Sequence, residues 1–287
     1  MSSDKLKRNN QLPIGVFDSG VGGLTVLKAL KSRIPNESFL YLGDTARLPY
    51  GTKSERTVAQ YAKQAANFLY QQRIKMLVIA CNTASAMALT VLQQAFPDIP
   101  VIGVIEPGAQ AAYNISKTGH IVVAATEATI ANQAYQRAIQ RLAPYATVIG
   151  QACSLFVALA EEGWLDGEVT TAVIKHYLLP YFNSNKQPQA DCLLLGCTHF
   201  PAFLPALYHV LGDEVAIVDS AYTAAEAVAV ALTYHDLHAV PTTRSSEVTY
   251  FATDAKERFI KVAQYFLQET IAPSCIHLVD IAAPQKL

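Results

Sequence analysis

Two of the five cysteines lie where a thiol could act as an acid or a base. Cys81 and Cys197 each follow a short apolar run and precede a segment expected to be helical. Free N–H groups at a helix start stabilise a thiolate and lower a thiol pKa from about 8.5 toward neutrality. The surrounding sequences are also alike, VIACNT at 78–83 and LLGCTH at 194–199. We therefore expect one acid/base thiol from each of two similar halves of the chain.

Two thiols on opposite sides of one site suit racemisation. One thiolate would remove a proton from one face of a carbon, and the other thiol would deliver a proton to the opposite face. The alternative is a thiol hydrolase, in which a cysteine attacks the substrate and a histidine assists it. His199 lies only two positions after Cys197, whereas the histidine of such a hydrolase usually comes from elsewhere in the fold. The residues alone leave both chemistries open.

Other polar residues also gather where apolar runs end. They are Asp18 and Ser19, Asp44 and Thr45, Asn82 and Thr83, Thr126, Thr198 and His199, and Asp219 and Ser220. Ligands of open parallel sheets bind beyond the carboxyl ends of the strands, and helix N-termini there favour anions. The pattern predicts a small polar site for an anionic ligand. For Asp219 and Ser220, a supporting hydrogen bond and contact with substrate are equally compatible with the sequence.

A glycine-rich turn at residues 20–23 raises the possibility of nucleotide binding. The pattern runs G-x-G-x-x-T, with Thr25 where a dinucleotide motif has its third glycine, and no phosphate-binding loop is present. We therefore favour a turn between strand and helix. The seven histidines are scattered, so we expect no metal. Cys153, Cys192 and Cys275 are expected to be buried core residues.

Composition bounds the class of protein. The chain has 287 residues, 51% hydrophobic and 16% charged, and a net charge of −1, which gives no field for binding nucleic acid or an anionic membrane. No run of 18 or more apolar residues is present. The odd number of widely spaced cysteines argues against a disulfide framework, and the N-terminal tail lacks an apolar leader. These features predict a cytoplasmic globular protein.

The elements that must position these residues follow a regular alternation. Short apolar runs at 14–17, 39–42, 76–80, 101–104, 121–124, 147–150, 192–195 and 215–218 alternate with helical patterns. Such alternation is typical of parallel βαβ units. We expect an α/β fold of two similar doubly wound parallel-sheet domains that face each other across an active-site cleft. The first would comprise residues 12–104 plus 220–270, and the second residues 105–219.

Several motifs in this order resemble those of the cofactor-independent aspartate/glutamate racemase superfamily, and within it the bacterial glutamate racemases. They are IGVFDSGVGGL at 14–24, YLGDTARLPYG at 41–51, ACNTAS at 80–85, GVIEPG at 103–108, Ala125-Thr126 with Thr129, and LGCTHFP at 195–201. One departure is Ser154, where many members have proline after the cysteine. The motifs span nearly the whole chain.

The resemblance implies interconversion of L- and D-glutamate for peptidoglycan synthesis, without pyridoxal phosphate, metal or nucleotide. It implies that Cys81 and Cys197 are the acid/base pair, assisted by Asp18, Glu161 and His199. Glu161 is chosen over its neighbour Glu162 by position in the motif alone. The implied substrate-binding residues are Asp18, Ser19, Pro49, Tyr50, Gly51, Asn82, Thr83, Thr126, Thr198 and His199. Family members are often homodimers, and a racemase of the same fold acting on aspartate or a hydantoin is the alternative.

Overall fold

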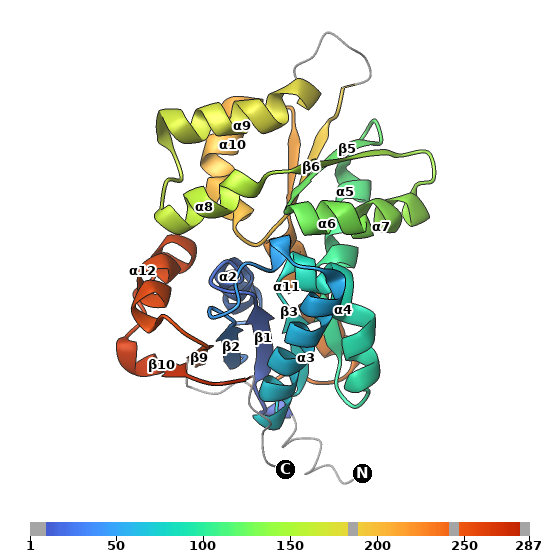
Figure 1. Ribbon diagram of the computed structural model, residues 1–287. Coiled ribbons are helices and arrows are strands. Elements are labelled where there is room, and N and C mark those ends of the chain that lie inside the picture. The colour runs from blue at the N-terminus through green and yellow to red at the C-terminus, as the bar shows by residue number, and fades with distance from the viewer. Residues whose placement is uncertain (1–9, 183–188, 241–246, 282–287) are drawn as a thin grey trace.

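A computed structural model describes residues 10–182, 189–240 and 247–281. The chain forms an α/β fold built on two parallel sheets, stacked one above the other in Figure 1. Among the described residues, no helix is both long enough and apolar enough to cross a membrane. The two parallel sheets and the helices between their strands confirm the predicted α/β fold class.

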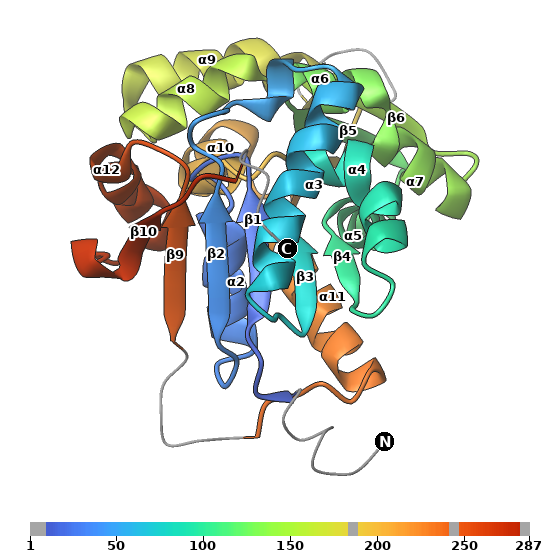
Figure 2. The same cartoon turned by 60° about the horizontal axis from the view of Figure 1, so that its bottom comes forward.

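The larger sheet holds strands from both ends of the chain. Its order is β10-β9-β2-β1-β3-β4, and every neighbouring pair is parallel (Figure 2). The strands are β1 (Ile14–Asp18), β2 (Phe39–Gly43), β3 (Met76–Ile79), β4 (Val101–Gly103), β9 (Val248–Ala252) and β10 (Ile276–Leu278). The apolar runs in the sequence predict the first four of these strands, whereas β9 and β10 were not predicted.

Helices cover both faces of this sheet. The helices are α2 (Leu24–Arg33), α3 (Glu55–Gln71), α4 (Asn82–Ala95), α11 (Ser220–Tyr234) and α12 (Lys256–Leu267), with the short 3-10 helices η1 (Tyr50–Thr52) and η3 (Pro273–Cys275). Side chains alternate along each strand, so Val16 and Val78 pack toward α2 and α11 while Phe17 and Leu77 pack toward α3 and α4. Burial on both faces explains why these strands read as continuous apolar runs.

The smaller sheet has the order β6-β5-β7-β8, and its pairs are again parallel. Its strands are β5 (His120–Ala125), β6 (Thr147–Ala152), β7 (Cys192–Gly196) and β8 (Ala216–Asp219). The helices around it are α5 (Ile105–Ile115), α6 (Glu127–Asn132), α7 (Ala134–Leu142), α8 (Ser154–Glu162), α9 (Gly167–Phe182), α10 (Leu204–Leu211) and the 3-10 helix η2 (Phe200–Phe203).

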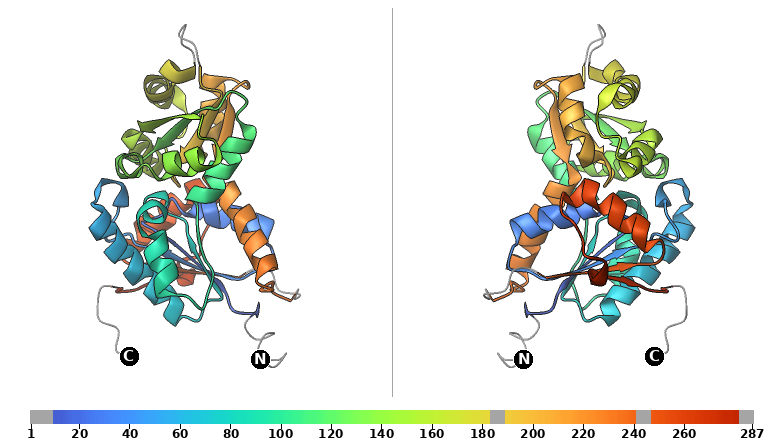
Figure 3. Two further views of the ribbon diagram at one scale, coloured as in Figure 1. Left: turned by 90° about the vertical axis from the view of Figure 1, so that its right-hand side faces the viewer. Right: turned by 90° about the vertical axis from the view of Figure 1, so that its left-hand side faces the viewer.

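The chain passes between the sheets at two places. It leaves the larger sheet after β4 through α5 and returns after β8 through α11, and these two helices are in contact (Figure 3). We keep the division into residues 12–104 plus 220–270 and residues 105–219 as a proposal. The sheet membership supports it with one amendment, because β10 extends the first half beyond residue 270.

Candidate active site

The carboxyl ends of the two sheets face each other, and the predicted polar residues lie there. Asp18 ends β1 and Cys81 follows β3, while Thr126 follows β5 and Cys197 follows β7. Both cysteines are buried, each with 5% of its surface exposed. Strand ends from both halves therefore enclose one polar site.

Cys81 occupies the N-cap position of α4. Its sulfur accepts a hydrogen bond from the Ala84 N–H at 3.5 Å and contacts the Ser19 hydroxyl at 3.7 Å. Burial raises the pKa of Cys81 to about 12, and the nearby carboxylate of Asp18 adds to this effect. Our expectation of a lowered pKa at Cys81 is wrong, because desolvation of the thiolate outweighs the N–H groups of the helix.

Cys197 stands in a different local structure from the one expected. The residues after β7 do not enter an α-helix; Thr198 and His199 lead into the 3-10 helix η2, and α10 begins only at Leu204. The sulfur of Cys197 lies 3.7 Å from Nδ1 of His199. The partner that the structure gives Cys197 is thus an imidazole rather than a helix N-terminus.

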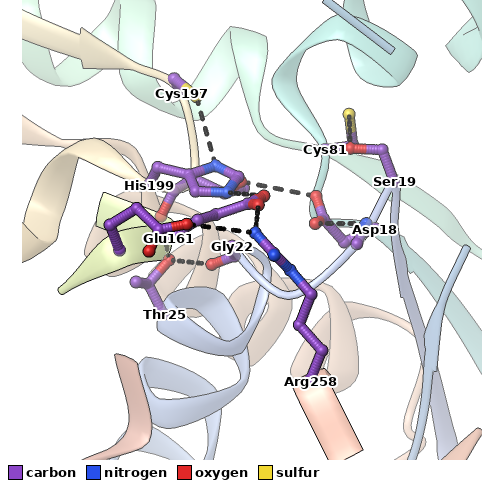
Figure 4. A network of polar contacts seen from close by, with 12 residues as sticks. Asp18, Ser19, Gly22, Thr25, Cys81, Glu161, Cys197, His199 and Arg258 are labelled. Atoms are coloured by element: carbon purple, nitrogen blue, oxygen red, sulfur yellow. Dashed lines mark hydrogen bonds and ion pairs between the residues drawn. The ribbon is translucent and has the colours of Figure 1, made fainter. Parts of the chain in front are cut away.

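A chain of polar contacts continues outward from Cys197 (Figure 4). Nε2 of His199 lies 3.3 Å from Oε1 of Glu161, and Oε2 of Glu161 accepts a hydrogen bond of 3.0 Å from Arg258. Burial lowers the pKa of His199, but its contacts with Cys197 and Glu161 and the charge of Asp18 outweigh burial and raise that pKa to about 10. Burial raises the pKa of Glu161, but the hydrogen bonds and charges of His199 and Arg258 outweigh burial, so that the net shift is downward. The electrostatics favour an imidazolium between a sulfur and a carboxylate.

The geometry distinguishes Glu161 from Glu162. Glu161 contacts His199 and has 13% of its side chain exposed, whereas the side chain of Glu162 is 60% exposed and lies 3.7 Å from Arg258. The position in the motif and the contact geometry therefore favour the same residue.

Asp18 links the two sides of the site. It is fully buried, and its carboxylate accepts hydrogen bonds from the Gly20 N–H at 3.0 Å and from the Thr198 hydroxyl at 3.5 Å. Burial raises its pKa, although His199 and the surrounding backbone N–H groups oppose that shift. Asp18 thus lies within the electrostatic reach of both Cys81 and His199.

Hydroxyl and amide groups join the halves on the other side of the site. Thr83 and Thr126 form a triangle of hydroxyls with Thr129, each pair 3.0 Å apart. The Asn82 amide donates to the Tyr135 hydroxyl at 2.7 Å and to the Ser220 hydroxyl at 3.3 Å, and its buried carbonyl oxygen has no hydrogen-bond partner among the described residues. Asp219 caps α11 by accepting from the Ala221 N–H at 2.7 Å. The contacts of Asp219 and Ser220 are therefore supporting hydrogen bonds.

The glycine-rich turn packs against the second half. A Cβ added to Gly22 would lie 2.5 Å from Nδ1 of His199 and from the Thr198 hydroxyl. The Thr25 hydroxyl donates to the carbonyl oxygens of Gly22 at 3.0 Å and of Thr198 at 2.9 Å. Thr25, which replaces the third glycine of a dinucleotide motif, thus joins the two halves.

The loop before η1 borders a hollow between the halves. The hollow has a volume of about 270 Å³, and the residues that line it include Pro49, Gly51, Thr126 and Glu161. A Cβ at Gly51 would lie 2.7 Å from the Cβ of Thr126, so glycine permits this close approach. The hydroxyl of the buried Tyr50 donates to Asp44.

The other three cysteines differ in their burial. Cys153 and Cys192 are buried as predicted, but Cys275 is exposed, because it ends η3 on the surface. Within the described ranges, no group of three or more histidine, cysteine, aspartate or glutamate residues could hold a metal.

A model of the Asp/Glu/hydantoin racemase family matches residues 21–228 of the chain. Together with the paired sheets and the polar site between them, this match shows that the chain belongs to the Asp/Glu/hydantoin racemase family.

Individual relatives narrow the similarity to glutamate racemases. The glutamate racemase of Geobacter metallireducens is 47% identical over 254 residues, which cover 88% of this chain and 92% of that protein. The glutamate racemase of Francisella tularensis in complex with D-glutamate has a TM-score of 0.85 and 37% identity, and the match covers 95% of this chain and 99% of that one. The Escherichia coli glutamate racemase in complex with L-glutamate has a TM-score of 0.72 and 27% identity, covering 89% and 95%.

Proposed function

We propose that this enzyme interconverts L- and D-glutamate by moving the α-proton between Cys81 and Cys197, without a cofactor. The observation that carries the proposal is the placement of two buried thiols after β3 and β7, on opposing halves of one polar site. The relatives named above supply the substrate, since they are glutamate racemases of which one is bound to D-glutamate and another to L-glutamate.

In this mechanism each thiol serves one face of the α-carbon. The thiolate on one side removes the α-proton, and the thiol on the other side donates its own proton to the opposite face; in the reverse direction the roles exchange. The product is the other enantiomer; one cysteine has gained the α-proton and the other cysteine has lost its thiol proton. A protonated His199 beside Cys197 stabilises negative charge on that sulfur, and Glu161 holds the imidazolium.

The site must stabilise a carbanion by electrostatics alone, since no cofactor accepts the electrons in this mechanism. The N-terminal N–H groups of α4 and α6 and the surrounding hydroxyls are suited to the substrate carboxylates. We assign substrate binding to Asp18, Ser19, Pro49, Tyr50, Gly51, Asn82, Thr83, Thr126, Thr198 and His199. Approach of the two halves around the substrate would exclude water and strengthen these contacts.

The wider role follows from the same resemblance. We propose that the enzyme works as a homodimer in the cytoplasm and supplies D-glutamate for peptidoglycan. All five cysteines are free thiols, which is in keeping with a reducing compartment.

The decisive experiment combines solvent deuterium with cysteine variants. In D₂O, we expect L-glutamate to yield D-glutamate with deuterium at the α-carbon, as measured by circular dichroism and mass spectrometry. Cys81→Ser and Cys197→Ser should each slow racemisation by roughly 10²–10⁴-fold, because each removes one acid/base group.

The control is Cys275→Ser, which changes an exposed thiol and should retain full activity. Full activity in either site variant would refute the two-thiol mechanism. Racemisation of L-aspartate but not of L-glutamate would instead assign the alternative substrate.

A further inference from the structure

Helix α12 belongs to the first half, but it contacts residues of the second half that lie beside Cys197. Besides the Arg258 contact with Glu161, the ring of Phe266 meets the ring of His199 edge-on, with centroids 5.4 Å apart at 90°. Gly163, the C-cap residue of α8, packs against Tyr265 of α12. A Cβ added to Gly163 would lie 2.6 Å from the Tyr265 ring. Three residues of α12 thus contact Glu161, the C-cap of α8 or His199.

Arg258 fixes the orientation of the Glu161 carboxylate. One oxygen of Glu161 faces His199 and the other accepts from Arg258, so the carboxylate is held from both sides (Figure 4). Glu161 also lines the hollow between the halves. Without the guanidinium, the carboxylate would be free to rotate toward that hollow and away from His199. A carboxylate of low exposure is stable there mainly when it is paired.

Among the residues that the structure describes, the hydrogen bonds of the Cys81 side chain stay within its own half. Its hydrogen-bond partners, Ser19 and Ala84, belong to the first half, as does the neighbouring Asp18. Any effect of α12 on proton transfer should therefore fall on one side of the substrate.

We propose that Arg258 is a positioning residue for proton transfer at Cys197, acting through Glu161 and His199 from the opposite half of the molecule. This inference rests on the proposed two-thiol function. It makes α12, which lies far along the chain from both cysteines, a part of the catalytic apparatus.

The test must separate the two proton transfers. Enantiomers are equally stable, so kcat/KM is the same in both directions and no variant can change that ratio. An α-deuterated substrate, however, reports only the removal step in each direction. If transfer at Cys197 slows, the deuterium isotope effect on kcat/KM must rise for the enantiomer that Cys197 deprotonates and fall for the other.

We therefore expect Arg258→Met to lower kcat/KM for glutamate by about tenfold and to move the two isotope effects in opposite directions. Arg258→Lys, which keeps the charge, should recover part of the rate and of the isotope effects. Arg141→Met is the matched control, because Arg141 forms an exposed ion pair with Glu106 and its loss should change neither.

The outcomes are distinct. Wild-type protein that does not racemise glutamate would overturn the proposed function itself. Active Arg258→Met protein whose two isotope effects are unchanged, or move together, would overturn the positioning role. Thermal denaturation of each variant shows whether a lower rate reflects loss of folded protein. The isotope effects are unaffected by such a loss, because only folded, active molecules contribute to them.

Discussion

At the scale of residues, the two cysteines have unlike surroundings despite their similar sequences. Cys81 caps α4 beside the buried Asp18, and its pKa is raised to about 12, chiefly by burial. Cys197 instead lies next to His199, whose pKa is raised to about 10 by its contacts with Cys197 and Glu161 in spite of burial. The resting site is therefore electrostatically asymmetric, with its cation on the Cys197 side.

This asymmetry predicts a pH-dependent contribution of His199 to stability. Its pKa is about 10 in the folded protein, against 6.5 for an ordinary histidine, so the folded state binds the proton more tightly. The stabilisation is fully present below pH 6.5 and is lost as the pH rises toward 10. His199→Gln should therefore be less stable than wild type at pH 6, and the difference should shrink by pH 10.

The measurement is urea denaturation of both proteins across this pH range. A shift of this size corresponds to a change on the order of a few kcal/mol in the difference between the free energies of unfolding. A difference that stays constant from pH 6 to pH 10 would show that His199 is not held as an imidazolium.

At the scale of elements, the turn between β1 and α2 illustrates how one segment serves the opposite half. The sequence motif there is glycine-rich, and the structure gives the reason at Gly22, whose α-carbon faces Thr198 and His199. Thr25, at the second position of α2, donates to the Thr198 carbonyl. The turn is thus a packing surface for the segment that follows Cys197.

Gly22→Ala should consequently impair catalysis more than it alters the fold of the turn. The new methyl group would lie 2.5 Å from atoms of both Thr198 and His199, so these side chains must move away from their positions near Cys197. We expect kcat/KM for glutamate to fall by roughly 10²-fold, since small displacements of catalytic groups have effects of this size.

Gly20→Ala is the comparison, because its added Cβ would lie 3.4 Å from Leu48, an ordinary contact distance. Its rate should fall much less than that of Gly22→Ala. Equal losses in the two variants, measured by the same circular dichroism assay, would show that the turn is sensitive to any side chain rather than to the approach of His199.

At the scale of the whole molecule, contacts on several sides of the site join the two halves. Tyr135 of α7 is central on one side: it accepts a hydrogen bond from Asn82, and its ring lies against Gly108 and Gly196. Tyr135 is 1% exposed, so a substitution there alters the packing of the core as well as the contact between the halves.

Tyr135→Phe should therefore weaken both stability and substrate binding. Loss of the hydroxyl removes the shorter of the two hydrogen bonds that the Asn82 amide donates, and we expect the free energy of unfolding to fall by about 1–2 kcal/mol. The KM for both enantiomers should rise, because Asn82 is no longer held in place. Tyr145→Phe, at a residue that is 76% exposed, should change stability by less than about 0.5 kcal/mol. Identical stability and KM in the two variants would exclude a role of the Tyr135 hydroxyl in joining the halves.

Local patterns were sufficient for much of the fold. Strands β1, β3 and β7 are continuous apolar runs because they are buried along their whole length, and this pattern is visible in the sequence. The missed strands, β9 and β10, lie at the edge of the larger sheet, where β10 has only three residues and both contain exposed or half-buried positions. The place of β9 is decided by pairing with β2, about 200 residues away in the chain, and β10 pairs in turn with β9.

The sequence by itself determined the alternation of strands and helices, the pair of cysteines and the family to which the chain belongs, because these are properties of local runs and motifs. Only the tertiary structure decided that Cys81 has a raised pKa, that a 3-10 helix follows Cys197, that Cys275 is exposed and that Arg258 reaches Glu161. The physical reason is the same in each case. Burial, charge and hydrogen bonding at these residues depend on segments brought together from distant parts of the chain, and the local sequence does not contain those distances.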